Sequence, residues 1–151
     1  MSKTIFCTII IVLAFCTSKL SAQGFLNLDA NNSQKKEYLL SKINKNLLSS
    51  NSIFLNNNQF HYGKNSTSLE LNYNEIFAIS KLSKKSKSEI ETIIIRINAN
   101  ETSFDLSQLN QLENLEIVYL LIEFDISEKE LVSKLTNISN WAIIYKISIP
   151  E

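Results

Sequence analysis

The chain has 151 residues, with 15 basic and 15 acidic side chains, and 44% of its residues are hydrophobic. A neutral balance lacks the basic excess that attracts nucleic acids and anionic membrane surfaces, so we expect neither as a partner. The length suits one domain with one core.

Residues 1–22 are predicted to be an export signal peptide. Lys3 supplies a positive charge, the apolar run Ile5–Phe15 follows, and small residues precede Gln23. The run is shorter than the ~20 residues of a membrane-spanning helix, so we expect no span after cleavage. Lipid attachment at Cys16 is an alternative, because the residues before it loosely match a lipoprotein processing site. Export predicts a periplasmic, cell-surface or extracellular location.

Cleavage would leave one domain, residues 23–151, with a composition that limits its chemistry. Both cysteines, Cys7 and Cys16, lie in the removed segment, so the mature chain has no thiol for a disulfide, a thiolate metal site or a nucleophile. Only two glycines are present in the whole chain. We therefore expect asparagine to occupy the left-handed turn positions that glycine usually takes.

The first third of the domain mixes helix and strand signals. Residues 23–34 are expected to be a loose lead-in. A helix is predicted from Ser33 to about Ser50, because Leu40, Ile43 and Leu47 recur at helical spacing.

A β-hairpin is predicted next, with strands at 52–55 and 59–62 around three asparagines. Leu69 and Leu71 alternate with polar residues, as in a strand. The lysine-rich stretch 83–88 is expected to be an exposed turn.

A 25-residue interval recurs through the second half of the chain. Ile93, Val118 and Ile143 are spaced by this interval, and so are the residues two and four positions after each of them. β-rich segments recurring in this way indicate parallel strands joined by crossovers. The predicted strands are residues 91–98, 117–124 and 142–149, with crossovers at 106–115 (helical or irregular) and 127–138 (helical, capped by Ser127).

Residues 88–149 resemble leucine-rich repeats. That family carries leucine-like residues as L-x-x-L-x-L-x-x-N-x-L. The segment from Leu106 to Leu120 has this spacing, and Ile90-x-x-Ile93-x-Ile95-x-x-Asn98 matches the first nine positions. Asn100 departs from the pattern, as do Glu123 and Ser148 at the asparagine position. The resemblance implies coils whose strands form one parallel sheet; a βαβαβ unit outside that family is the alternative.

Both faces of the predicted sheet carry apolar rows. One face of such a sheet is covered by its crossovers, so the other needs a second cover, for which we expect the N-terminal helix. The alternative is an open surface for a partner. Arg96, Tyr119 and Lys146 belong to that second face, and the Arg96 guanidinium is expected to reach a carboxylate such as Glu123.

Catalytic signals are few. His61 is the only histidine and is expected to be a partly exposed strand residue, so no multi-histidine metal site can form, and no cofactor motif is present. Glu123 and Asp125 follow the second strand, where α/β sheets often bind ligands. A helix start is the simpler reading of Asp125.

The sequence predicts an exported α/β protein with a small parallel or mixed sheet and two crossover helices in a leucine-rich-repeat-like βαβαβ arrangement. An N-terminal helix and a β-hairpin complete it. We expect a non-catalytic module that binds another envelope or secreted protein. The residues expected to bind it are Arg96, Tyr119, Glu123, Asp125 and Lys146. A small carbohydrate-binding or hydrolytic protein using the strand-end carboxylates is the alternative.

Overall fold

The computed structural model describes residues 25–27, 37–39, 41, 43, 52–56, 59–63 and 66–148. The predicted export signal, residues 1–22, lies outside these residues, as do Leu40 and Leu47 of the predicted N-terminal helix. The described positions between 37 and 43 are helical, as the sequence predicts.

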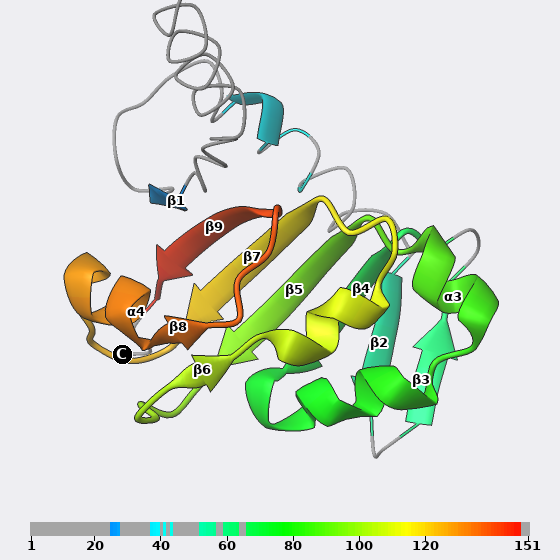
Figure 1. Cartoon of the computed structure of the whole chain (residues 1–151), viewed down its shortest axis with the longest axis horizontal. Coiled ribbons are helices and arrows are strands. Elements are labelled where there is room, and N and C mark those ends of the chain that lie inside the picture. The colour runs from blue at the N-terminus through cyan, green and yellow to red at the C-terminus, as the bar shows by residue number, and fades with distance from the viewer. Residues whose placement is uncertain are drawn as a thin grey trace, which may run out of the picture.

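The protein is α/β, built on a mixed sheet of seven strands in the order β1-β9-β7-β5-β4-β2-β3 (Figure 1). Every neighbouring pair is parallel except β2 and β3, which pair antiparallel. The strands are β1 (Phe25–Asn27), β2 (Ser52–Asn56), β3 (Gln59–Tyr62), β4 (Ser68–Asn72), β5 (Thr92–Ile97), β7 (Ile117–Ile122) and β9 (Ala142–Ile147).

Residues 25 apart in the sequence lie opposite one another in the central strands. Ile93 lies opposite Val118, which lies opposite Ile143, and the next two rows repeat this pairing. The prediction of parallel strands at this interval is confirmed. One further strand precedes them, because β4 pairs in parallel with β5, placing Leu69 opposite Ile93.

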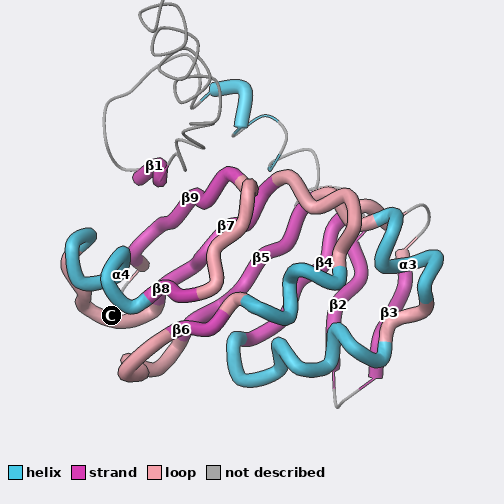
Figure 2. The backbone as a smooth tube through the Cα atoms, viewed as in Figure 1, coloured by secondary structure: helices cyan, strands magenta, loops and turns pink. Residues whose placement is uncertain are grey.

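Three connections join the four strands β4, β5, β7 and β9, and all lie against one side of the sheet (Figures 1 and 2). Their elements, in chain order, are the 3₁₀ helix η1 (Tyr73–Lys81), α3 (Lys84–Glu89), β6 (Phe104–Asp105), the 3₁₀ helix η2 (Ser107–Gln111), α4 (Glu128–Lys134) and β8 (Leu135–Thr136). Serine hydroxyls cap the N-termini of α3 and α4, because Ser83 accepts from the Ser86 N–H and Ser127 from the Glu130 N–H.

Three expectations about secondary structure that were drawn from the sequence are wrong. Residues 83–88 were expected to be a turn, but helix α3 spans Lys84–Glu89, with Ser83 as its N-cap. Helix α4 ends at Lys134 and not at residue 138, since Leu135 and Thr136 pair with β6. Within the lead-in 23–34, Phe25–Asn27 forms strand β1 and pairs with β9.

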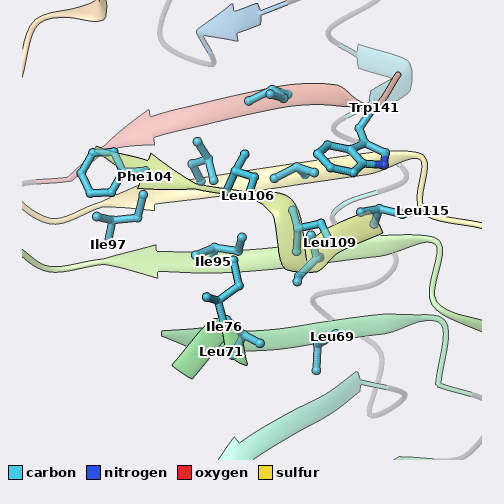
Figure 3. Packing of buried hydrophobic residues seen from close by; sticks show 14 of the residues in the cluster. Leu69, Leu71, Ile76, Ile95, Ile97, Phe104, Leu106, Leu109, Leu115 and Trp141 are labelled. Atoms are coloured by element: carbon cyan, nitrogen blue, oxygen red, sulfur yellow. The ribbon is translucent and has the colours of Figure 1, made fainter. Parts of the chain in front are cut away.

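The main core lies between the connections and the first face of the sheet, which we define as the face bearing Ile93, Val118 and Ile143 (Figure 3). Leucines and isoleucines from the connections, such as Ile76, Leu109 and Leu131, are at most 2% exposed and fill this layer. Burying each of them contributes about 1.5–3 kcal/mol. Several central residues in this layer are labelled in Figure 3: Leu69, Leu71, Ile95, Ile97, Phe104, Leu106, Leu115 and Trp141.

A smaller cluster covers part of the second face, which bears Ile94, Tyr119 and Ile144. Leu39 and Ile43, from the helical residues near the N-terminus, are buried with these side chains and Ile117. The expectation that the N-terminal helix covers this face is therefore confirmed for Ile43.

Strands β6 and β8 form a short parallel ribbon held by polar contacts. The Leu106 N–H donates to the carbonyl of Thr136 at 3.1 Å, and Asn137 Nδ2 donates to Asp105 Oδ1 at 2.8 Å. Asn137 has a φ of 55°, so asparagine does occupy a left-handed turn position, as expected.

Candidate functional site

The second face has a polar and aromatic part beyond its apolar cluster. Residues opposite one another in the register point to the same face. Phe54 lies opposite Glu70, and Asn72 lies opposite Arg96, in the rows that cross β2, β4 and β5. This part of the face therefore gathers an aromatic ring, a carboxylate, an amide and a guanidinium.

Arg96 is the centre of an ion-pair network on this face. Its Nε and Nη2 atoms both donate to Glu70 Oε1, at 2.9 Å and 2.8 Å. Its Nη1 atom lies 3.5 Å from Glu123 Oε1. The hydrogen bond to Glu70 raises the pKa of Arg96 above its ordinary value. Strands β4 and β5 and the residue that follows β7 are thus linked by one cation and two carboxylates.

The rings of Phe54 and His61 stack beside this network. Their centroids are 5.0 Å apart and their planes differ by 11°. Phe54 is 46% exposed, a large fraction for a phenylalanine on a sheet. The two residues are directly opposite in the antiparallel β2–β3 pair, which explains the stack.

An open hollow of about 310 Å³ adjoins Phe54 of the stack and the Glu70 and Arg96 side chains of the network. Its lining residues are Phe54, Leu55, Glu70, Leu71, Asn72 and Arg96. We name the surface formed by Phe54, His61, Glu70, Asn72 and Arg96 the Phe54–Arg96 patch. Ring, carboxylate, amide and guanidinium groups meet there within reach of solvent.

The structure brings two of the residues predicted to bind a partner, Arg96 and Glu123, into contact. Arg96 and Lys146 share a row of the second face but are separated by Leu121. Lys146 and Asp125 are exposed. Tyr119 is 8% exposed and packs in the smaller cluster, so its ring belongs to a core and not to the patch.

The expected ion pair between Arg96 and Glu123 is confirmed. The sequence did not predict the shorter ion pair, between Arg96 and Glu70. Glu70 belongs to the patch because Leu69 and Leu71 point into the main core, which turns Glu70 to the other face. That alternation is visible in the sequence. The position of β4 next to β5 cannot be predicted from the sequence, because β4 lies outside the repeat.

A larger hollow, of about 580 Å³, lies at the amino ends of β4 and β5. It is lined by Ile53, Tyr62, Gly63, Ser66, Thr67, Lys85, Ser86, Ser88, Glu89 and Glu91. Two of its hydroxyls are used locally, since Ser66 donates to the Gly63 carbonyl and Ser88 to the Lys85 carbonyl. Part of its polar lining is therefore engaged within the chain, as is Asn72 of the patch, whose Nδ2 donates to Glu75 Oε2 at 2.8 Å.

Within the described part of the chain, no group of three or more histidine, cysteine or acidic residues is placed to hold a metal ion. Among the same residues, no helix combines the length and apolar character needed to cross a membrane. No protein-family model matches the chain, and neither a curated protein nor a solved structure does.

Proposed function

We propose that this protein is an exported, non-catalytic interaction module of the cell envelope, and that a partner protein binds at the Phe54–Arg96 patch. The observation that carries the proposal is the position of the exposed Phe54 ring, stacked on His61 and directly opposite Glu70, the main partner of Arg96. Aromatic rings and arginines are the side chains most enriched at protein interfaces.

The rigidity of the patch supports this role. Its residues lie on β2, β3, β4 and β5, four strands that are hydrogen-bonded side by side. A side chain on a sheet loses less conformational freedom on binding than one on a loop. The ion pairs also fix Arg96 while leaving it 41% exposed, so a partner carboxylate can reach its guanidinium.

The coils of residues 88–149 are proposed to be of the leucine-rich-repeat type. Support comes from their parallel in-register strands and from the apolar residues that each connection directs at the first face. In such architectures each coil buries its apolar face on its neighbours, which leaves strand faces and edges for partners.

A photo-crosslinking experiment tests the proposed surface. A photoreactive phenylalanine analogue at Phe54 is expected to crosslink one discrete protein in native envelope extract, and Arg96→Glu is expected to abolish that product. Phe77 is a matched control, because it is 69% exposed but lies on η1, which packs against the opposite face of the sheet. Equal crosslinking from both positions would contradict the proposal.

Carbohydrate binding is a second candidate, favoured by the open ring of Phe54 beside Asn72 and Glu70 in the hollow. Sugars combine an apolar face with hydroxyls, which a ring and nearby amide and carboxylate oxygens can match. Envelope glycans titrated against the protein would show saturable binding that Phe54→Ala removes. The strand-end carboxylate Glu123 would contribute only while still paired with Arg96.

A further inference from the structure

Strand β3 ends the sheet, and its outer edge is open in the described structure. It is the terminal strand of the sheet order, and among the described residues it pairs only with β2. His61 and Tyr62 are exposed, Tyr62 to 57%. An open edge presents backbone donors and acceptors to any strand that can lie alongside it.

The hydrogen-bond pattern shows which residues of β3 face outward. The Gly63 N–H donates to the Ser52 carbonyl at 3.2 Å, so this opposite pair is of the hydrogen-bonded kind. Such pairs alternate along an antiparallel ladder. His61 therefore bonds towards β2, whereas Phe60 and Tyr62 direct their N–H and C=O groups to the open edge.

The edge also lacks the features that usually prevent strand pairing. Gln59–Tyr62 contains no charged residue and no proline, although 20% of the chain is charged. Its register with β2 is continuous, without a bulge. Proteins normally protect exposed edges with lysines, prolines or bulges, so an unprotected edge indicates a strand that pairs with another strand.

We propose that two copies of this chain pair through β3, antiparallel, about a two-fold axis that passes between their His61 residues. In that register Phe60 of one copy lies opposite Tyr62 of the other, and these outward-facing residues exchange four backbone hydrogen bonds. Strand β3 can satisfy its own outward N–H and C=O groups when it pairs with β3 of another copy. A second copy of this chain is therefore the partner that we propose for this edge.

Side chains fit this register as well as the backbone does. Phe60 and Tyr62 already lie 6.4 Å apart between ring centroids on the first-face side of β3. In the dimer each gains an aromatic cross-strand neighbour, a favourable pairing. On the second face, the two His61–Phe54 stacks meet at the axis.

The proposed dimer would strengthen partner binding at the patch, but the dimer does not depend on that function. A two-fold axis perpendicular to a continuous sheet keeps both second faces on one side. Two Phe54–Arg96 patches would then form one bivalent surface, and bivalent binding exceeds the affinity of either patch alone. Failure of the dimer would leave partner crosslinking at Phe54 unchanged, so the two proposals can be separated.

Disulfide trapping tests the register. In the full chain with Cys7→Ser and Cys16→Ser, His61→Cys is expected to give a disulfide-linked dimer under mild oxidation, because opposite residues of this kind have Cα atoms about 4.5 Å apart. Tyr62→Cys is the matched control. Its two copies would lie diagonally, about 8 Å apart from the strand spacing and rise, beyond disulfide reach.

Sedimentation of the unmodified protein tests the association itself. Wild type is expected to show a concentration-dependent monomer–dimer equilibrium, and His61→Lys to raise its dissociation constant at least tenfold by placing two ammonium groups at the axis. Phe77→Lys, on the opposite side of the molecule, is expected to leave the equilibrium unchanged. A wild type that stays monomeric, or equal trapping from residues 61 and 62, would overturn the proposal. So would crosslinking of β3 to a different protein while the chain stays monomeric.

Discussion

Arg96 and Glu70 form the shortest ion pair of the network on the second face, with Nη2 of Arg96 2.8 Å from Oε1 of Glu70. The same guanidinium stands 3.5 Å from Glu123. Two of its nitrogens share one Glu70 oxygen, whereas Glu123 meets a single nitrogen. The Arg96–Glu70 pair therefore contributes more than the Arg96–Glu123 pair.

Double-mutant cycles measure this difference. The coupling free energy between Arg96→Met and Glu70→Gln is expected to be about 1 kcal/mol, since the side chains are partly exposed and solvent weakens the pair. The coupling with Glu123→Gln is expected to be less than half of that. Urea unfolding of the single and double variants gives both values.

The exposed pair Lys85–Glu89 serves as the control for these cycles. Its atoms are 3.7 Å apart and the lysine side chain is 83% exposed, so its coupling is expected to be close to zero. A coupling at Glu123 equal to that at Glu70 would show that the geometry of the network differs in solution.

Leu120 and Leu121 test the assignment of the two faces. They are adjacent on β7, but Leu120 is fully buried in the main core, whereas Leu121 is half-buried on the second face. Leu120→Ala is expected to lower the free energy of unfolding by about 3 kcal/mol, through lost burial and the cavity left behind. Leu121→Ala is expected to cost about 1 kcal/mol or less. Chemical denaturation compares the two, and a reversed order would mean that the register is shifted by one residue.

The central sheet could be predicted from the sequence because its signal is periodic. Ile95, Leu120 and Tyr145 share one row at the same interval that the sequence displays. Strand period and repeat interval together fix both register and faces. The core assignment of these rows follows from the same pattern.

The positions of the elements in the crossovers, and the residues of the patch, could not be predicted from the 25-residue period. The two 25-residue units place their elements differently, because η2 follows β6 in the first whereas α4 precedes β8 in the second. The Ser127 cap of α4 and the two-residue pairing of β6 with β8 set those positions, and neither leaves a periodic signal. Phe54 and Glu70 meet through the pairing of β2 with β4, two strands outside the repeat. Only the tertiary structure brings them together.

Asp105 makes the β6–β8 ribbon sensitive to acid. Hydrogen bonds from Asn137 and from the N–H and hydroxyl of Ser107 lower the pKa of Asp105 below its ordinary value of 3.8. A carboxylate with a lowered pKa in the folded state stabilises the fold above its ordinary value and loses that contribution as the pH falls through the lowered value.

The free energy of unfolding of wild type and of Asp105→Asn, measured from neutral pH to below 3.8, checks this effect. The difference between the two proteins is expected to be largest at neutral pH and to shrink as the pH falls below the ordinary value. The variant keeps a similar side-chain shape without titrating, so the other carboxylates cancel in the comparison. A constant difference across the range would contradict the assignment.

Asn137 combines two roles that separate substitutions can distinguish. Its φ of 55° is unfavourable for a residue with a Cβ atom, and its side chain donates to Asp105 at 2.8 Å. Asn137→Gly removes the hydrogen bond but suits the backbone, so a small loss of stability is expected. Asn137→Ala removes the hydrogen bond and adds a backbone cost of about 1 kcal/mol in the left-handed region. The order of stability in urea unfolding should therefore be asparagine, glycine, alanine. Alanine matching glycine would mean that the backbone leaves the left-handed region in solution, and the turn that aligns β8 with β6 would then have another cause.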